Sequence, residues 1–267
     1  MGDELFLWYN VINTNMAAQV KVLVEGFTDA DSKAESGGER TCATISLVRD
    51  GDLIMVVDPG VLESQQILID ALQKEGLNIG DVNMVCITHS HIDHYGNVGM
   101  FPNAKILEYF GLWDKGACED WQEQFTPNIQ ILRTPGHDYT GITLFVTTEK
   151  GVVAVCGDVF WKENYPEYPR DDAFASDHEK LERSRESVLK MADWIIPGHA
   201  GMHRARKATK GAEEQLSSTP AKPFGVCRKC KRTIENKLDS CRCRPHLCHH
   251  CCECGLDCDL CGCSHKK

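Results

Sequence analysis

The sequence predicts an α/β protein whose two β-sheets lie between outer helices, followed by a separate cysteine-rich tail. Short apolar segments typical of strands occur in two groups, and each group includes one segment with the periodicity of an amphipathic helix. Strands and helices in this order suit two packed sheets with helices outside. The length of 267 residues and the hydrophobic content of 42% allow one sizeable core plus an appendage.

The first group of strands is expected between residues 20 and 107. Asp50 and Gly51 form a typical hairpin turn between two apolar runs. The segment from Leu62 to Glu75 has apolar residues at helical spacing and ends before Gly76, which predicts a helix. Strands are predicted at residues 20–27, 41–48, 53–57, 82–87 and 104–107.

The second group of strands is expected between residues 129 and 196. A helix is predicted from Asp177 to Met191, and strands at residues 129–132, 142–147, 152–155 and 194–196. Between the two groups, residues 111–126 are polar and aromatic. We expect this segment to form a loop near the mouth of a site.

Three imidazoles and one carboxylate lie within six residues, directly after the strand predicted at 82–87. They belong to His89, His91, Asp93 and His94, so they occupy a tight loop in which side chains can converge. Imidazole nitrogen and carboxylate oxygen are usual zinc ligands, and two adjacent metals need about seven or eight donors. The rest of the chain should therefore supply about three more.

The remaining donors are His137, Asp158 and His199. Each follows a predicted strand and has a glycine immediately before it, which allows the backbone to turn sharply. A single histidine at a strand end is usually an ordinary surface residue. The repeated order of strand, glycine and ligand favours a metal site.

This order of motifs resembles the metallo-β-lactamase superfamily. The resemblance rests on His-x-His-x-Asp-His, then His, Asp and His, preceded by Val57-Asp58-Pro59-Gly60, and it runs roughly from Val20 to His199. It implies the αββα sandwich of that family. Ser90 and Ile92 depart from the family pattern, and neither is a ligand position.

The resemblance also implies a ligand set for two zinc ions. One zinc ion would lie on His89, His91 and His137. The second would lie on Asp93, His94 and His199, with Asp158 bridging the two. Asp58 would lie outside the ligands and hold a ligand imidazole in the right tautomer.

The predicted chemistry is metal-assisted hydrolysis. Two zinc ions about 3.5–4 Å apart would lower the pKa of the water between them, so that a nucleophile forms near pH 7. The predicted catalytic carboxylates are Asp93 and Asp158, and Asp93 can hold the proton of the nucleophile while it binds metal.

Three further segments extend the resemblance to one branch of the superfamily: Asn97–Pro102, Gly157–Phe160 and Glu182–Arg185. This branch implies an endoribonuclease that cleaves RNA phosphodiester bonds in histone pre-mRNA 3′-end processing, with RNA as its partner. Two enzymatic alternatives stay open, a thioester or lactone hydrolase of the glyoxalase II type and a mononuclear iron persulfide dioxygenase. Glyoxalase II has a helical substrate-binding region after its last histidine, whereas here a linker and tail follow His199. A non-catalytic zinc-storing or scaffold protein is a further alternative.

Charge is distributed unevenly along the chain. Residues 1–203 hold 15 basic and 32 acidic residues, whereas residues 204–267 hold 14 basic and 7 acidic residues. An acidic body disfavours a long RNA footprint, because affinity for nucleic acid depends largely on Lys and Arg.

The chain has no run of 18 apolar residues and no signal-peptide pattern, so we expect a cytoplasmic or nuclear protein without a membrane partner. A homodimer is one expected assembly.

Three regions are predicted: a hydrolase domain at 1–206, a linker at 207–226 and a cysteine-rich tail at 227–267. The tail holds 11 of the 15 cysteines. Its two Cys-x2-Cys pairs are separated by a spacing usual for zinc ribbons, which makes Cys227, Cys230, Cys248 and Cys251 candidate zinc ligands. The alternatives are an unstructured metal-scavenging segment and an erroneous gene model.

The segment Trp161–Arg170 follows the proposed bridging Asp158 and is expected to shape substrate choice. Trp161, Tyr165 and Tyr168 would stack on an unpaired base. The alternative is that these aromatic residues close the edge of the core.

Overall fold

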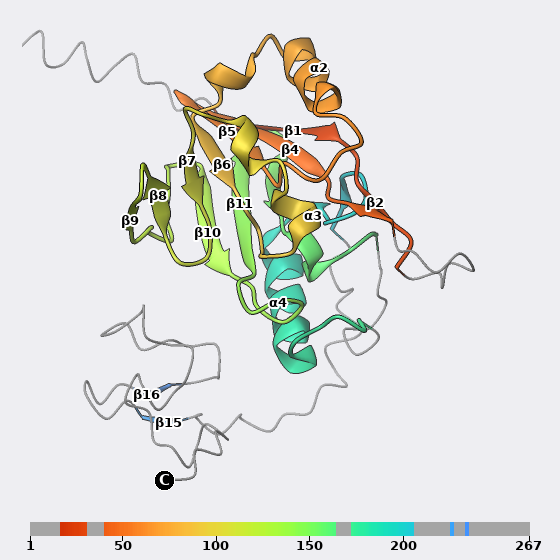
Figure 1. The fold of residues 1–267 in the computed structure, drawn as a ribbon. Coiled ribbons are helices and arrows are strands. Elements are labelled where there is room, and N and C mark those ends of the chain that lie inside the picture. Colours follow the sequence, from red (N-terminus) through yellow and green to blue (C-terminus); the bar gives the residue numbers. More distant parts are fainter. Residues whose placement is uncertain (1–16, 31–39, 164–171, 206–224, 227–232, 235–267) are drawn as a thin grey trace, which may run out of the picture. The chain divides into compact units, whose positions relative to one another are not determined.

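The computed structural model describes residues 17–30, 40–163, 172–205, 225–226 and 233–234 (Figure 1). The chain divides into two compact units, Met1–Lys207 and Ala208–Lys267, and each is described by itself. In the second unit, β15 (Gly225–Val226) pairs antiparallel with β16 (Thr233–Ile234). The four tail cysteines named as candidate ligands lie outside the described residues, as does most of the predicted linker.

The first sheet has the strand order β1-β4-β5-β6-β7-β8-β9. The pairs β5–β6 and β6–β7 are parallel, and the others are antiparallel. Its strands are β1 (Gln19–Val24), β4 (Ile45–Asp50), β5 (Leu53–Val57), β6 (Met84–Cys86), β7 (Lys105–Leu107), β8 (Leu112–Asp114) and β9 (Ala117–Glu119).

The second sheet has the strand order β10-β11-β12-β13-β14. Here β12 and β13 are parallel and the other neighbours antiparallel. Its strands are β10 (Ile129–Arg133), β11 (Ile142–Thr148), β12 (Gly151–Val155), β13 (Trp194–Ile196) and β14 (His203–Arg204). A separate two-stranded ribbon pairs β2 (Phe27–Thr28) with β3 (Thr41–Cys42).

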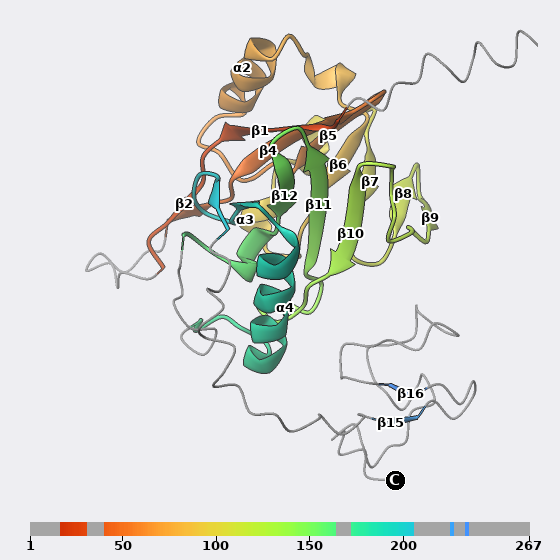
Figure 2. The same ribbon diagram turned by 180° about the vertical axis from the view of Figure 1, so that it is seen from behind.

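Helices cover the outer faces of both sheets, as the sequence predicts. Helix α2 (Gln66–Lys74) buries Leu68 and Leu72 against the first sheet. Helix α4 (His178–Met191) packs Val188 against the second sheet (Figure 2). A third apolar cluster, including Met55 and Leu144, fills the space between the sheets. These three interfaces build the αββα sandwich.

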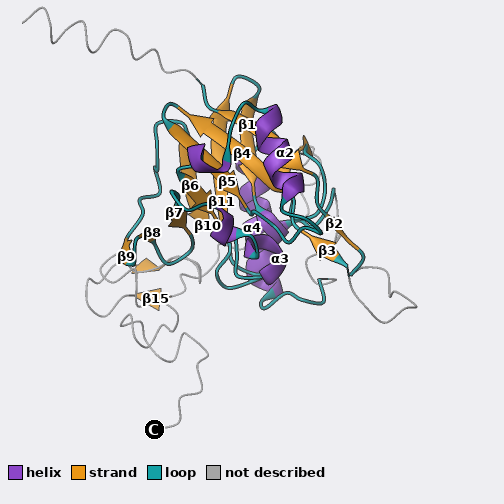
Figure 3. Cartoon of the chain, turned by 45° about the horizontal axis from the view of Figure 1, so that its top comes forward, coloured by secondary structure: helices purple, strands orange, loops and turns teal. Residues whose placement is uncertain are grey.

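Five strands of the two sheets end near the same edge of the sandwich. In the first sheet the parallel strands β5 and β6 lead to Asp58 and His89. In the second sheet β10, β12 and β13 all run in one direction and lead to His137, Asp158 and His199. The loops after these strands gather beside the short helix α3 (Ile92–Tyr95) (Figure 3). Carboxyl ends of strands are where ligands bind in many α/β sheets.

The structure differs from the sequence-based expectation in three places. The strand predicted at 41–48 is divided into β3 and β4, with residues 43–44 in neither. The strand predicted at 20–27 is split at Gly26, where an added Cβ would lie 2.4 Å from the backbone nitrogen of Thr44. The prediction of a loop at 111–126 is wrong over residues 112–119, because β8 and β9 form a hairpin there. Lys115 and Gly116 both have positive φ, as a tight two-residue hairpin turn requires.

In the described part of the chain, no helix combines the length and the apolar character needed to span a membrane. Of the four cysteines in the body, Cys42, Cys86 and Cys156 are buried and Cys118 is exposed. Cys86 and Cys156 are therefore core thiols, as expected from their places in apolar segments.

Candidate metal centre

The loop after β6 places four donors on two neighbouring turns. Thr88 anchors its start, because its backbone nitrogen and hydroxyl donate to the two oxygens of Asp58, each at 2.7 Å. The chain then enters α3 at His91, whose backbone oxygen accepts from the nitrogen of His94 at 3.0 Å. This short helix gives Asp93 and His94 a turn of their own, and the ring of His94 stays 4.1 Å from that of His89 between centroids.

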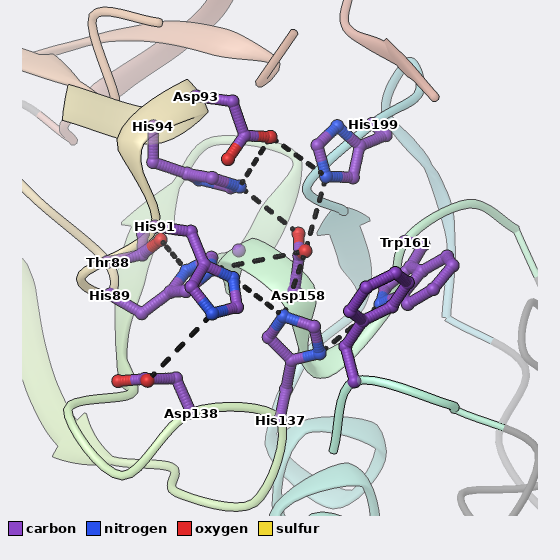
Figure 4. A network of polar contacts seen from close by, with 12 residues as sticks. Thr88, His89, His91, Asp93, His94, His137, Asp138, Asp158, Trp161 and His199 are labelled. Carbon is purple, nitrogen blue, oxygen red and sulfur yellow. Dashed lines mark hydrogen bonds and ion pairs between the residues drawn. The ribbon is translucent and has the colours of Figure 1, made fainter. Parts of the chain in front are cut away.

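The first donor group consists of His89, His91, His137 and Asp158. His91 Nδ1 lies 3.0 Å from His89 Nε2 and 3.1 Å from His137 Nε2. His137 Nε2 lies 3.3 Å from Asp158 Oδ2. Figure 4 shows these four side chains pointing toward one another.

The second donor group consists of Asp93, His94 and His199. Asp93 Oδ2 lies 3.9 Å from His94 Nε2 and 3.7 Å from His199 Nε2. The carboxylate of Asp158 also faces this group, because Oδ1 lies 3.3 Å from His94 Nε2 and Oδ2 lies 3.2 Å from His199 Nε2. Asp158 therefore lies between the two groups. The structure thus brings together all seven side chains singled out from the sequence.

These donor sets fit metal ions. Ligands at the zinc–nitrogen distance of about 2.0–2.1 Å in a tetrahedron are about 3.3 Å apart, and the donor separations here bracket that value. His94 Nε2 and Asp158 Oδ1 are both buried and make no hydrogen bond to any described residue, although they lie 3.3 Å from each other. Buried polar atoms are rarely left unsatisfied, so a cation between the two atoms accounts for their arrangement.

A carboxylate outside the donor groups orients two of the imidazoles. His94 Nδ1 donates to Asp58 Oδ2 at 2.8 Å, which leaves Nε2 as the donor atom. His89 Nδ1 lies 3.2 Å from the Thr88 hydroxyl, which itself donates to Asp58. Asp58 has a φ of 50°, a left-handed backbone conformation uncommon for residues other than glycine. The structure thus places Asp58 where the sequence analysis expected an orienting carboxylate.

Other orienting groups were not identified from the sequence. Asp172 Oδ2 accepts from His137 Nδ1 at 2.8 Å, and the backbone oxygen of Cys42 accepts from His199 Nδ1 at 3.0 Å. The Thr41 hydroxyl donates to Asp93 Oδ2 at 2.9 Å. Asp171-Asp172 before the predicted α4 was the only sequence signal for the first of these contacts.

The donor groups open to solvent at His91 and Asp93. The side chain of His91 is 39% exposed and that of Asp93 is 14% exposed, whereas those of the other five donors are at most 6% exposed. Two side chains near this opening are largely exposed. Ile92 follows His91 in the chain, and Tyr139 follows Asp138, whose carboxylate lies 4.0 Å from His91 Nε2. A substrate that approaches the donor groups from this side therefore passes the imidazole of His91 and the exposed side chains of Ile92 and Tyr139.

Burial and charge shift the pKa values of the donors in opposite directions. Burial, assisted by the charge of His94, lowers the pKa of His89 well below its ordinary value. Burial acts the same way on His94, but the carboxylates of Asp58 and Asp158 outweigh it and raise the pKa of His94 well above its ordinary value. Burial alone would raise the pKa of Asp158, yet His199, His94 and His137 hold it well below its ordinary value. The centre therefore keeps a buried, ionised carboxylate that requires positive charge around it.

Trp161 does not form an exposed stacking face, so that part of the prediction for residues 161–170 is wrong. Its side chain is buried, and its ring lies edge-on to His137 with 5.9 Å between ring centroids (Figure 4). Tyr165 and Tyr168 lie outside the described residues.

Comparison with known proteins agrees with this geometry. The family model of the metallo-beta-lactamase superfamily matches residues 43–115. Metallo-beta-lactamase domain-containing protein 1 of Xenopus laevis is 32% identical over 210 residues, which covers 74% of this chain and 87% of the frog protein. The Rattus norvegicus protein of the same name is 35% identical over 170 residues, covering 60% of this chain and 67% of the rat protein.

More distant relatives share the fold. A hydroxyacylglutathione hydrolase of Albidiferax ferrireducens is 31% identical over 126 residues, covering 44% of this chain and 47% of that enzyme. The crystal structure of a Thermotoga maritima metallo-beta-lactamase superposes with a TM-score of 0.56 at 20% identity, covering 70% of this chain and 99% of that one. The chain belongs to the metallo-β-lactamase superfamily of metallo-hydrolases and is a relative of metallo-beta-lactamase domain-containing protein 1.

Proposed function

We propose that this protein is a dinuclear zinc hydrolase that cleaves phosphodiester bonds in RNA, acting as an endoribonuclease in histone pre-mRNA 3′-end processing. The observation that carries the hydrolase part of the proposal is the position of Asp158. Its carboxylate faces His137 and His89 on one side and His94 and His199 on the other. A single carboxylate between two imidazole groups suits two metal ions that share one ligand.

The seven donors named above would hold these ions, with Asp158 common to both. Two zinc ions would supply Lewis acidity and a water of lowered pKa. Asp93 is the carboxylate nearest to solvent, and Thr41 fixes its orientation by donating to Oδ2. Asp93 would therefore hold the proton of the attacking water.

The RNA part of the proposal has narrower support. It comes from the resemblance to one branch of the superfamily, in which the segments Asn97–Pro102 and Gly157–Phe160 are shared. The acidic body, with 32 acidic and 15 basic residues over positions 1–203, favours a short footprint with few phosphate contacts. Apolar or aromatic contacts to bases would then provide much of the binding energy.

A second candidate is a small-molecule thioester or lactone hydrolase. The exposed Ile92, directly after His91 in the chain, and the exposed Tyr139, directly after Asp138, would also suit an acyl group. The named hydroxyacylglutathione hydrolase of Albidiferax ferrireducens is a relative over 44% of this chain. This candidate uses the same two donor groups, so substrate turnover has to distinguish it from the first.

The test is turnover of three substrates by the zinc-loaded chain: single-stranded RNA, a glutathione thioester and a chromogenic lactam. We expect RNA cleavage that a chelator abolishes and added zinc restores. A His94→Ala variant purified in the same way controls for contaminating ribonuclease. Thioester turnover without RNA cleavage would establish the second candidate in place of the first.

A further inference from the structure

The carboxylate of Asp172 binds two residues, one through each oxygen: His137, a proposed metal ligand, and Phe174, a partly exposed aromatic residue. Oδ2 accepts from His137 Nδ1 at 2.8 Å, and Oδ1 accepts from the backbone nitrogen of Phe174 at 2.9 Å. Asp172 is completely buried. Its charge faces Arg185, whose pKa burial lowers to about 10 against the opposing effect of Asp172. A buried, charge-balanced carboxylate of this kind fixes both of its partners.

The backbone of the same segment closes around His137. The backbone oxygen of His137 accepts from the nitrogen of Ser176, and the oxygen of Gly136 accepts from the nitrogen of Asp177, both at 2.9 Å. Gly136 has a φ of 141°, and an added Cβ would lie 2.2 Å from the backbone nitrogen of Leu181 in α4. His137 is therefore packed tightly against residues 172–181 on the side away from the other donors.

Four aromatic rings connect the open side of the centre to Phe174. His91 and His137 have ring centroids 4.8 Å apart, His137 and Trp161 5.9 Å, and Trp161 and Phe174 5.6 Å. The two ends of this row are partly exposed and the two middle rings are buried, with Phe174 50% exposed. On the Trp161 side of His137, the exposed aromatic surface is thus that of Phe174, because Trp161 itself is buried.

We infer that Phe174 is a specificity-determining residue that stacks on an unpaired base of the substrate, and that Asp172 positions Phe174 and the ligand His137 as one unit. The stacking half of this inference rests on the proposed cleavage of RNA, whereas the positioning half requires only metal binding. A base held at Phe174 would compensate for the scarcity of positive charge on the body. Because one carboxylate fixes both residues, the face that binds the base keeps its position relative to the reacting bond.

The positioning half is tested by zinc affinity, measured by competition with a chromogenic chelator in the absence of substrate. Asp172→Asn keeps the size of the side chain but removes the charge that holds the Nδ1 proton of His137. We expect the weaker of the two zinc affinities to fall by roughly 10- to 100-fold, the usual effect of losing such a partner. Asp81→Asn is the matched control, because Asp81 likewise accepts from a backbone nitrogen, that of Asn78, but lies outside the donor groups and should leave zinc affinity unchanged.

A spectroscopic measurement on the unmodified, metal-free chain keeps the test independent of how the variant folds. Imidazole proton–nitrogen correlation spectra should show His137 with its proton on Nδ1. A proton on Nε2, or a zinc affinity that Asp172→Asn does not change, would overturn the positioning role.

The stacking half is tested by steady-state cleavage of a single-stranded RNA oligonucleotide. Phe174→Ala should raise KM by roughly 5- to 150-fold, the range of one base–aromatic stack, with kcat and zinc content unchanged. Phe110→Ala is the control, because Phe110 is also half-exposed but lies beside Tyr109, outside the donor groups. If the unmodified chain cleaves RNA and Phe174→Ala leaves KM unchanged, only the stacking role of Phe174 is contradicted. If the unmodified chain did not cleave RNA, the proposed substrate would be wrong, and so would the stacking role of Phe174. The zinc-affinity test of Asp172 would not be affected, because it uses no RNA.

Discussion

Asp58 Oδ2 accepts a hydrogen bond from His94 Nδ1 at 2.8 Å, in a pair whose side chains are at most 3% exposed. The same oxygen accepts from the Thr88 hydroxyl, which lies 3.2 Å from His89 Nδ1. One carboxylate thus orients an imidazole in each donor group. The left-handed backbone of Asp58 and the positive φ of Gly60 turn the chain sharply at this point, directly after β5.

Asp58→Asn is expected to weaken both metal sites. An amide carries no charge to hold the Nδ1 proton of His94 or to fix the Thr88 hydroxyl beside His89 Nδ1, so zinc affinity should fall by about 10- to 100-fold while the side chain still fills its space. Chelator competition measures this affinity, and Asp70→Asn on the exposed face of α2 is the control. If the affinity for both ions were unchanged, the role of Asp58 would be to stabilise the turn after β5, and it would not orient the metal ligands.

Truncation of Asp158 should abolish hydrolysis. Neither His94 nor Asp158 faces a solvent-filled cleft, because His94 is fully buried and Asp158 is 5% exposed. His94→Ala would therefore leave a cavity and should lower the melting temperature as well as turnover. Asp158→Ala is the cleaner variant, and we expect no turnover, less than two bound zinc ions and an unchanged circular dichroism spectrum. Turnover retained in Asp158→Ala would contradict its bridging role.

A chain ending at residue 207 should bind two metal ions. It contains both sheets, the three apolar clusters and all seven donors, and it lacks the tail cysteines that would bind zinc themselves. Elemental analysis after dialysis measures the count, and treatment with chelator should remove both ions together with activity. One ion per active chain would contradict the dinuclear centre, and a mononuclear iron persulfide dioxygenase would become the leading alternative.

The sequence was sufficient to predict the layers of the fold because the apolar patterns are local. Leu68 and Leu72 show the helical spacing of α2, and the runs 142–147 and 152–155 show the paired strands of a hairpin. The hairpin of β8 and β9 was missed, since its strands are three residues each and bury none of their side chains. Only the Lys115-Gly116 turn distinguished it from a loop.

The donors were predictable for a different reason. Each follows an apolar strand and a turn, so the parallel strand ends of each sheet imply their convergence. The orienting contacts were not predictable, because they join residues far apart in sequence. Asp172 lies 35 residues from His137, and Cys42 lies 157 residues from His199. No local pattern distinguishes such a residue from an ordinary loop aspartate or a backbone carbonyl.

Gly198→Ala should disrupt the centre more than it disrupts the fold. The backbone of Gly198 is fixed on both sides, because its nitrogen donates to the oxygen of Phe160 at 2.9 Å and its oxygen accepts from Thr44 at 2.6 Å. An added Cβ would lie 1.7 Å from Asp158 Oδ1, so the carboxylate must rotate away from the imidazoles that flank it. We expect a loss of about 1–3 kcal/mol of stability from overpacking, measured by chemical denaturation of the metal-free chain, and a zinc affinity at least tenfold lower. Gly99→Ala is the matched control, since nothing lies within 4 Å of its added Cβ, and it should change stability by less than about 0.5 kcal/mol. If Gly198→Ala bound two zinc ions as tightly as the unmodified chain, Asp158 could not occupy the place between the donor groups that its bridging role requires.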